Sequence, residues 1–198
     1  MINLKNISNE EPYKLFLKKY NDATTAGETN PEAIVISSYN KEDNEVDSRM
    51  VNLKAINGKE LIFFSNYNSP KSFAFKSHDQ ISGLFYWPSI NVQVRIKAMI
   101  RKTSLEFNQK YFKERSLEKN ALAISSRQSE QISSYSKVIK NYDEVYKRSD
   151  LHICPDYWGG FSFTPYYFEF WEGHEFRINK RLVFLKKVEK WKKFIIQP

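Results

Sequence analysis

The stretch AIVISSYNKEDNEVDSRMVNLKAINGKELIFF, residues 33–64, decides the fold of this chain. Its opening run, AIVISSY, is short and rich in β-branched side chains, which predicts a strand. Residues 49–56 alternate well enough for a second strand. Asn57-Gly58 is then a strong hairpin signal before the apolar run LIFF. Three strands joined by short turns predict an antiparallel meander.

The rest of the chain continues as short strands interrupted by helices. We predict helices over residues 12–20, 69–76, 104–115 and 135–147, and further strands over residues 80–87, 91–102, 168–171, 181–186 and 191–195. Residues 1–10 are polar and are expected to be irregular. Many short strands with hairpin signals argue for a barrel or a sandwich rather than a parallel α/β sheet. The predicted fold class is therefore mainly β with helices.

The composition indicates an ordinary folded domain. The chain has 198 residues, of which 41% are hydrophobic and 27% charged, enough for one domain with a real core. The single cysteine, Cys154, cannot form an internal disulfide, and no Cys/His spacing suits zinc, so no metal site is expected. The amino terminus lacks the apolar run of a signal peptide, and no stretch approaches roughly 18 apolar residues, so no membrane span is expected. We therefore expect a cytoplasmic protein.

The net charge of +8 favours an anionic partner. A nucleic acid and a phosphorylated metabolite are both candidates. Because the lysines are spread along the chain rather than clustered, no nucleic-acid partner is expected. Glycine is scarce, at 6 residues, which argues against a glycine-rich phosphate loop.

The stretch YWGGFSFTPYYFEFWEGHEFRINKR, residues 157–181, is the first candidate for a binding site. It is rich in aromatic residues, and Arg177 and Arg181 follow them, four residues apart. A flat hydrophobic surface followed by two arginines suits a planar, anionic, ring-shaped ligand. The alternative interpretation is a pair of packed strands with a solvated basic end.

Two other segments offer anion sites. Arg49 and Lys54 are an odd number of residues apart, so in an extended strand they are expected on opposite faces, where they would serve different anions or leave one in solvent. Residues 65–71, SNYNSPK, combine hydroxyls, a helix start and a lysine, which favours phosphate. A plain capped helix is the alternative, and it needs only Ser69.

Three further features are weak individually. Gln93 is a neutral amide on a strand that otherwise carries cations, and an amide that both donates and accepts suits a heteroaromatic edge. Tyr111 and Arg115 lie at i and i+4 of one helix face, where they could grip a second phosphate. RQS at residues 127–129 forms a polar corner. A surface glutamine and a local packing pair are the alternatives for the first two.

The order of these motifs resembles the pyridoxamine 5′-phosphate oxidase family. The motifs that carry the resemblance are RMV-x-L-K at residues 49–54, S-N-x-x-S-x-K at 65–71, QV at 93–94, YF-x-x-R at 111–115, RQS at 127–129, WGGF at 158–161, EFW at 169–171 followed by Arg177 and Arg181, and the terminal pattern at 191–198. The resemblance covers nearly all of the chain from about Pro12 onward.

The resemblance implies a split β-barrel, a Greek-key FMN-binding fold, assembled as a homodimer with two FMN molecules at the subunit interface. On this basis residues 1–198 are one FMN-binding split-barrel domain. A helical insert is expected over about residues 104–148, and a C-terminal dimerisation and active-site segment over about residues 157–198.

The resemblance also implies individual site residues. The implied FMN contacts are Arg49, Met50, Val51, Phe64, Ser65, Lys71, Gln93, Gln128, Ser129, Trp171 and Arg181. Arg49, Lys71 and Ser129 would hold the FMN phosphate, whereas Gln93, Trp171 and Arg181 would lie nearer the flavin ring. The implied substrate contacts are Lys54, Tyr111, Arg115, Lys119, Arg177 and Asn179. Arg177 and Asn179 are the implied catalytic positions, with Arg177 covering the substrate ring opposite the flavin.

The implied reaction oxidises pyridoxamine or pyridoxine 5′-phosphate to pyridoxal 5′-phosphate. A hydride would pass from the substrate C4′ carbon to flavin N5, and O2 would then reoxidise the flavin and yield H2O2. With the amine substrate, water would hydrolyse the imine and release ammonia. The protein itself would mainly position two stacked rings.

Three departures from the family pattern lie in the implied site. Asn179 stands where the pattern R-x-H has histidine, Pro70 where a second basic residue precedes Lys71, and Lys119 where a serine helps to hold the substrate phosphate. Asparagine can form hydrogen bonds but does not titrate near neutral pH. Two alternatives follow: a related FMN oxidase on another planar anionic substrate, as in phenazine biosynthesis, and a low-turnover protein that binds flavin or pyridoxal phosphate.

Overall fold

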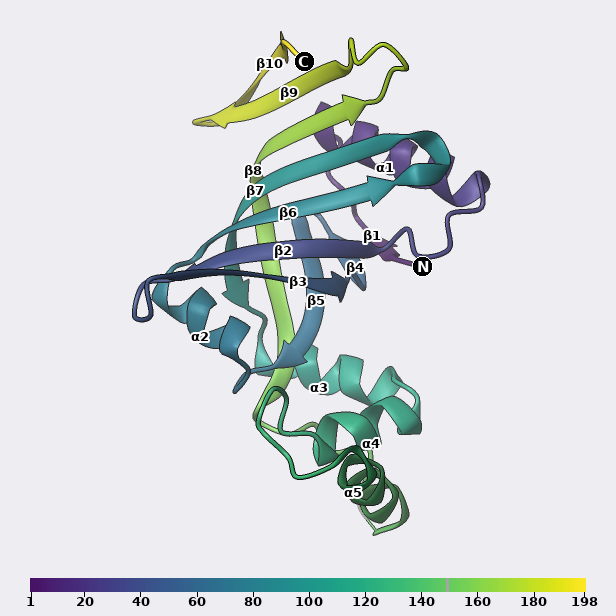
Figure 1. The fold of residues 1–198 in the computed structure, drawn as a ribbon, viewed down its shortest axis with the longest axis vertical. Coiled ribbons are helices and arrows are strands. Elements are labelled where there is room, and N and C mark those ends of the chain that lie inside the picture. Colours follow the sequence, from purple (N-terminus) through teal and green to yellow (C-terminus); the bar gives the residue numbers. More distant parts are fainter. Residues whose placement is uncertain (149) are drawn as a thin grey trace.

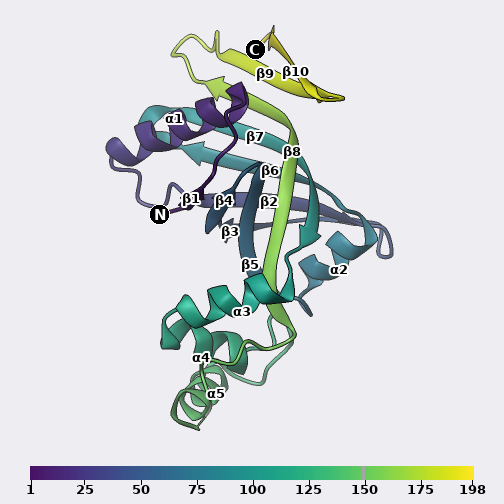
Figure 2. The same ribbon diagram turned by 180° about the vertical axis from the view of Figure 1, so that it is seen from behind.

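Strand β8, Trp158–Glu172, is the centre of the fold. In the computed structural model, which describes residues 1–148 and 150–198, one side of β8 pairs with β7, Val92–Lys102. The other side is shared, because the first half of β8 pairs with β5, Glu60–Asn66, and the second half with β9, Lys180–Lys187. All three pairings are antiparallel, and β8 is the long pale-green strand that spans Figures 1 and 2.

The sheet closes on itself at a two-residue link. Its strands follow the order β1–β4–β5–β8–β7–β6–β2–β3. The remaining bounds are β1 Asn3–Lys5, β2 Ala33–Asn40, β3 Glu45–Asn52, β4 Ala55–Asn57, β6 Gln80–Trp87 and β10 Lys190–Ile196. Between β3 and β4, the Leu53 N–H donates to the Glu32 carbonyl at 2.9 Å and the Lys54 N–H to the Ile62 carbonyl at 2.8 Å. Adjacent residues thus bond to β5 and to the segment before β2, so regions far apart in the strand order meet and the sheet curls into a barrel.

The predicted meander is wrong in its middle. The β2–β3 and β4–β5 hairpins form as predicted, but β3 and β4 are not neighbours in the described sheet. The strand predicted over residues 49–56 is therefore divided at residues 53 and 54. The expectation of an irregular amino terminus is also wrong, because Asn3–Lys5 pairs in parallel with β4.

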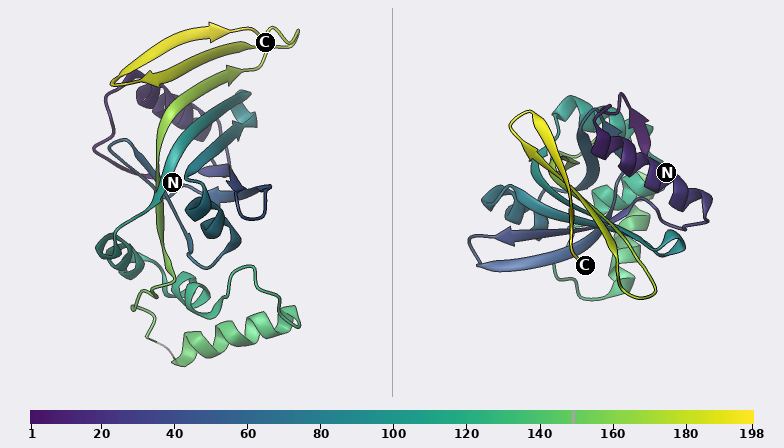
Figure 3. Two further views of the ribbon diagram at one scale, coloured as in Figure 1. Left: turned by 90° about the vertical axis from the view of Figure 1, so that its left-hand side faces the viewer. Right: turned by 90° about the horizontal axis from the view of Figure 1, so that it is seen from above.

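The four predicted helices are confirmed, although α1 runs five residues beyond its predicted end at residue 20, and one further helix, α4, is present. The helices are α1 Glu11–Thr25, α2 Pro70–Ser77, α3 Leu105–Glu114, α4 Leu117–Ser125 and α5 Tyr135–Arg148, with a short 3-10 turn at Pro88–Ile90. Figures 1 and 3 show α3–α5 gathered at one end of the barrel and the β9–β10 hairpin at the other. Among the residues described, no helix has the length and apolar character that crossing a membrane requires.

Aromatic side chains fill the space between α1 and the sheet. Phe16 of α1 packs against Phe85 and Trp87 of β6, with ring centroids 5.2 and 5.9 Å apart. The indole N–H of buried Trp87 donates to the Pro31 carbonyl at 2.9 Å. The polar atom of this large side chain is thus satisfied, as burial of a tryptophan requires.

A polar network in the first turns of α3 requires glycine at position 159. The Asn108 amide donates to the Tyr67 hydroxyl at 3.0 Å, and its carbonyl oxygen accepts the Gly160 N–H at 2.9 Å. The Tyr67 hydroxyl in turn donates to the Gly160 carbonyl at 3.0 Å. A Cβ on Gly159 would overlap both the Tyr67 hydroxyl and the Asn108 amide. This network fixes the end of β8 to α3.

We expect Gly159→Ala to lower the free energy of unfolding by about 2–3 kcal/mol, because an added methyl group must displace a hydrogen-bonded pair. Urea denaturation followed by circular dichroism measures the change. Gly83→Ala is the matched control, because the one atom among the described residues that its Cβ would approach within 3 Å is the flexible end of Ile34, at 2.8 Å. Equal stability losses in the two variants would contradict the role given to the network.

Candidate functional site

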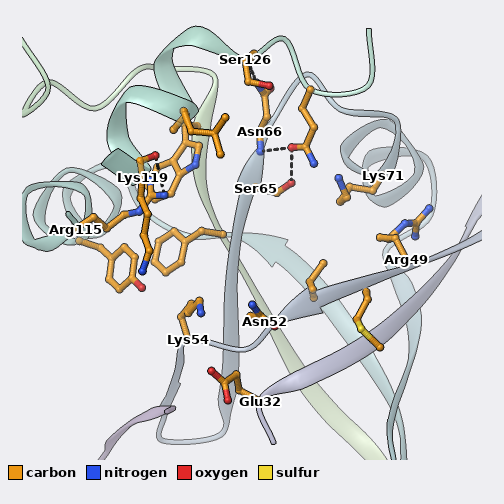
Figure 4. Close-up of a pocket in the computed structure, with 18 of the residues that line it drawn as sticks. Glu32, Arg49, Asn52, Lys54, Ser65, Asn66, Lys71, Arg115, Lys119 and Ser126 are labelled. Carbon is orange, nitrogen blue, oxygen red and sulfur yellow. Dashed lines mark hydrogen bonds between the residues drawn. The ribbon is translucent and has the colours of Figure 1, made fainter. Parts of the chain in front are cut away.

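A cleft of about 1080 Å³ opens between the link of β3 to β4, strand β5 and helices α3 and α4. Among the predicted site residues, those that line it are Arg49, Met50, Val51, Lys54, Phe64, Ser65, Lys71, Tyr111, Arg115, Lys119, Gln128 and Ser129. Figure 4 shows Arg49 and Lys71 on one side of the cleft and Arg115 and Lys119 on the other. The expectation that Arg49 and Lys54 point to opposite faces is wrong, because the strand ends between them and both reach the same cleft.

Arg49 and Lys71 form the first cationic group. Arg49 is fixed by its Nη1, which donates to the Ser38 hydroxyl at 2.7 Å and to the Ile36 carbonyl at 3.2 Å, and its Nη2 pairs with the Asp47 carboxylate. Lys71 is 8% exposed and donates to the Ser69 hydroxyl at 3.3 Å. It makes no ion pair with any described residue. Burial lowers the pKa of Lys71, and the nearby Arg49 charge lowers it further.

Amide and hydroxyl groups lie next to this pair of cations. The Gln128 side-chain oxygen accepts from the Ser65 hydroxyl and from the Asn66 N–H, each at 3.3 Å. The Asn66 amide donates to the Ser126 carbonyl at 3.4 Å, which ties β5 to the end of α4 (Figure 4). Ser129 lies in the same wall with a φ of 71°. This part of the cleft presents donors beside two cations, as a phosphate site requires.

Stacked aromatic rings form the opposite wall. The Phe64 ring lies parallel to Tyr111, at 3.8 Å between centroids, and to Trp158, at 5.1 Å. The Arg115 guanidinium lies over Trp158, 4.4 Å from its centroid. Arg115 Nη1 is buried and has no hydrogen-bond partner among the described residues. A buried guanidinium nitrogen without an acceptor is costly, which points to an anion as the missing partner.

Lys54 and Lys119 complete a second cationic group with Arg115. Burial lowers the pKa of Lys54, and the charges of Lys119 and Arg115 add to this shift, whereas the Glu32 carboxylate opposes it. Glu32 also lines the cleft. Glu114 lines the cleft as well, so two carboxylates lie near these three cations.

The Lys54 pKa predicts how anion binding responds to pH. A bound anion favours charged Lys54, so affinity depends on the protonated form, and that form is lost at a lower pH than for an ordinary lysine. We expect the affinity for a bound phosphate to fall as pH rises through the lowered pKa of Lys54, and so at a lower pH than for an ordinary lysine. Lys54→Arg should flatten this profile because arginine stays charged. Isothermal titration at several pH values measures both, and an unchanged slope in the arginine variant would contradict the assignment.

A second group of predicted residues lies outside the cleft. Gln93, Trp171 and Arg181 are direct neighbours across β7, β8 and β9, so their side chains share one face of the sheet. Arg181 donates through Nε and Nη2 to Glu169, at 2.9 and 2.7 Å, and through Nη1 to the Gln197 carbonyl at 3.1 Å. Glu169 is 1% exposed and also accepts from Arg95 at 3.0 Å.

The remaining two predicted residues, Arg177 and Asn179, lie on the loop between β8 and β9. Arg177 is exposed and has a φ of 62°. The Asn179 side-chain oxygen accepts the His174 N–H at 3.0 Å. The structure thus separates the predicted site into a cleft and a distant face, with Trp158 and Trp171 near opposite ends of β8.

Comparison with known proteins shows which family the chain belongs to. The family described as "Pyridoxine 5′-phosphate oxidase C-terminal dimerisation region" matches residues 158–198. The pyridoxine/pyridoxamine 5′-phosphate oxidase of Colwellia psychrerythraea is 32% identical over 195 residues, covering 96% of this chain and 88% of that protein. The chain belongs to the pyridoxine/pyridoxamine 5′-phosphate oxidase family. The oxidase of Haemophilus influenzae is also 32% identical, covering 96% of this chain and 90% of its own.

Solved structures show that this family member has the predicted split β-barrel. PhzG of Burkholderia lata, in complex with tetrahydrophenazine-1-carboxylic acid, superposes with a TM-score of 0.87 at 24% identity, covering 95% of this chain and 93% of that one. A pyridoxamine 5′-phosphate oxidase-related, FMN-binding protein from Nostoc punctiforme gives a TM-score of 0.79 at 9% identity, covering 96% and 99%. The family resemblance and fold class expected from the motifs are therefore confirmed.

Several residues that line the cleft were not predicted from the sequence. Glu32, Asn52, Asn66 and Ser126 line it but were not among the predicted ligands. Asn66 stands inside the motif at residues 65–71, so its position offered a signal. Glu32 offered none, because only the closure of the barrel brings the segment before β2 beside Lys54.

Proposed function

We propose that this protein is an FMN-dependent oxidase that converts pyridoxamine or pyridoxine 5′-phosphate to pyridoxal 5′-phosphate, with O2 as acceptor and H2O2 as product. Ammonia is the second product from the amine. One observation carries the proposal: a single cleft has two cationic groups, Arg49 with Lys71 and Arg115 with Lys54 and Lys119, and stacked aromatic rings form the wall beside Arg115. Two anionic ligands with flat rings fit such an arrangement.

The first cationic group fits the phosphate of FMN. Lys71 is buried without a carboxylate partner among the described residues, and the Ser65 and Gln128 side chains lie beside it. A phosphate there would supply the missing counter-charge. Bound FMN supplies the redox chemistry, and the residues of this chain bind it, orient it and exclude water.

The second group fits the substrate phosphate. The unpartnered Arg115 Nη1 would gain an acceptor, and the Tyr111 hydroxyl would donate to the same phosphate. Burial raises the pKa of Tyr111, so it stays a donor across the working pH range. Lys54 and Lys119 would complete the charge balance, and Arg177 would cover the exposed face of the substrate ring.

A second copy of the chain would complete each site. One flavin cannot touch both Lys71 in the cleft and Trp171 at the far end of β8, since a strand rises about 3.3 Å per residue over its whole length. Gln93, Trp171 and Arg181 would therefore come from the partner. The match of residues 158–198 to a dimerisation region supports a homodimer. Mixing two inactive variants, Lys71→Met and Trp171→Ala, should restore activity if each site takes one group from each copy.

The visible spectrum tests the cofactor and the substrate together. The purified protein loaded with FMN should be yellow, and pyridoxamine 5′-phosphate added without oxygen should bleach it. Admitting oxygen should restore the colour and produce pyridoxal phosphate and peroxide. A protein that binds FMN but stays oxidised with every B6 phosphate would instead be a low-turnover binding protein.

Oxidation of another planar anionic substrate is the second candidate. The Glu32 carboxylate beside Lys54 reduces the positive charge at the substrate end, and the Asn179 side chain is occupied within its own loop. Both features would suit a substrate with a single negative charge. PhzG, of similar fold, is solved with such a tricyclic carboxylate. Bleaching by a phenazine-type carboxylate but not by B6 phosphates would favour this candidate.

A further inference from the structure

The loop at residues 173–179, between β8 and β9, is held by hydrogen bonds that converge on His174. The Arg177 N–H donates to the His174 carbonyl at 2.9 Å. The Phe176 N–H donates to His174 Nδ1 at 3.2 Å, and the His174 N–H donates to the Asn179 side-chain oxygen at 3.0 Å. Main-chain and side-chain atoms of one residue thus fix the tip of the loop.

The backbone of Arg177 needs this support. Its φ of 62° lies in the left-handed region, which costs a residue with a side chain roughly 1–2 kcal/mol. Such a conformation persists where the surroundings fix it. The turn closed on the His174 carbonyl and the acceptor at Nδ1 are the contacts that do so here.

The base of the loop is fixed independently of His174. The Gly173 N–H donates to the Asn91 carbonyl at 3.0 Å, and Trp171 is paired with Arg181 across the two strands. Removing the His174 side chain would therefore release the tip of the loop and leave the strands in place.

We propose that His174 is a positioning residue for Arg177: its Nδ1 holds the loop tip so that the Arg177 side chain is presented toward the substrate. The destination of that side chain rests on the proposed function. The tautomer follows from the geometry, since a ring nitrogen that accepts the Phe176 N–H leaves the proton on Nε2. His174 acts through Arg177 and need not touch the substrate.

Two substitutions separate this role from direct chemistry by the imidazole. His174→Ala removes the acceptor. His174→Asn keeps one, because an asparagine oxygen accepts from the N–H two residues on and forms the same turn. In the FMN-loaded dimer, the alanine variant should lose about tenfold in kcat/KM for pyridoxamine 5′-phosphate, whereas the asparagine variant stays within about threefold of the parent. FMN affinity should not change in either, and His152→Ala, at an exposed position elsewhere, is the control.

A double-mutant cycle and hydrogen exchange complete the test. In an Arg177→Ala background, adding His174→Ala should have no further effect, because the two residues act as one unit. Amide exchange at Phe176 and Arg177, followed by NMR, should quicken in His174→Ala and stay slow in His174→Asn. Additive losses in the cycle, equal loss in both variants, or unchanged exchange would each overturn the proposal. If the parent protein oxidises no B6 phosphate, the proposed function fails, whereas the exchange data still decide whether His174 holds the loop.

Discussion

Replacing Lys71 by methionine should abolish the retention of FMN while making the empty protein more stable. The ammonium is buried, its neighbour is the Arg49 cation, and its hydrogen bond is to the Ser69 hydroxyl. The Asp47 carboxylate offsets only part of the effect of burial and of Arg49, so without a bound anion the buried ammonium is unfavourable, and methionine fills the same space without a charge. We expect FMN to bind about 100-fold more weakly, which corresponds to about 2.7 kcal/mol.

The same substitution weakens FMN binding but should raise the stability of the empty protein. The Lys71 pKa is lowered in the folded state, so the unfolded chain holds more protons between that lowered value and the ordinary one near 10.5. Lys71 therefore destabilises the empty protein at neutral pH, and this destabilisation fades as pH rises through that window. In Lys71→Met we expect the Tm of the empty form to rise by about 2–4 °C at pH 7. Lys76→Met, on the exposed side of the same helix, is the control for both measurements. A methionine variant that retains FMN would contradict the placement of the phosphate.

Replacing Arg115 by methionine should remove substrate binding and leave FMN binding intact. The guanidinium stacks on Trp158 and lines the cleft, and its buried Nη1 has no hydrogen-bond partner among the described residues. A phosphate held there by charge-assisted bonds loses its best-oriented donor, so we expect KM to rise about 100-fold. FMN affinity should stay within about threefold, since the proposed FMN phosphate site at Arg49 and Lys71 lies at the other end of the cleft.

Two further variants sharpen the Arg115 test. Arg115→Lys should recover only part of the loss, because an ammonium cannot reproduce the planar stacking and the fork of donors. Lys113→Met, in the exposed last turn of α3, should behave as the parent protein. Steady-state kinetics and FMN titration on the same preparations measure both constants. Equal losses of FMN and substrate affinity would indicate a single shared phosphate site instead of two.

Local signals predicted the elements well, because each depends on a few neighbouring residues. The Asn57-Gly58 turn and the Ser69-Pro70 helix start lie where the sequence placed them. The division of the strand at Leu53 and Lys54 could not be predicted, because no local pattern shows that β4 pairs with β1 and β5 instead of β3. The strand at Asn3–Lys5 was missed for the same reason, since its partner is distant in the sequence.

The candidate site was predictable only as a set of motifs. Tyr111 and Arg115 were correctly placed on one helix side by their spacing, and both reach the cleft. The separation of Trp171 and Arg181 from that cleft needed the length of β8, which the strand predicted over residues 168–171 underestimated. The positions of Glu32 in the cleft and of His174 in the loop could be recognised only from the contacts of the folded chain.

The central place of β8 has a consequence for synthesis on the ribosome. Leu61 of β5 pairs with Phe163 of β8, and Ile96 of β7 pairs with Phe168 of β8. Both phenylalanines lie in the last quarter of the chain, so they are synthesised after their partners. Until then the nascent polypeptide exposes two unpaired strand edges, a hazard for aggregation. Contacts so distant in sequence also slow the final closure. Production of this protein should therefore benefit from slow translation at low temperature and from chaperones that shield the growing chain.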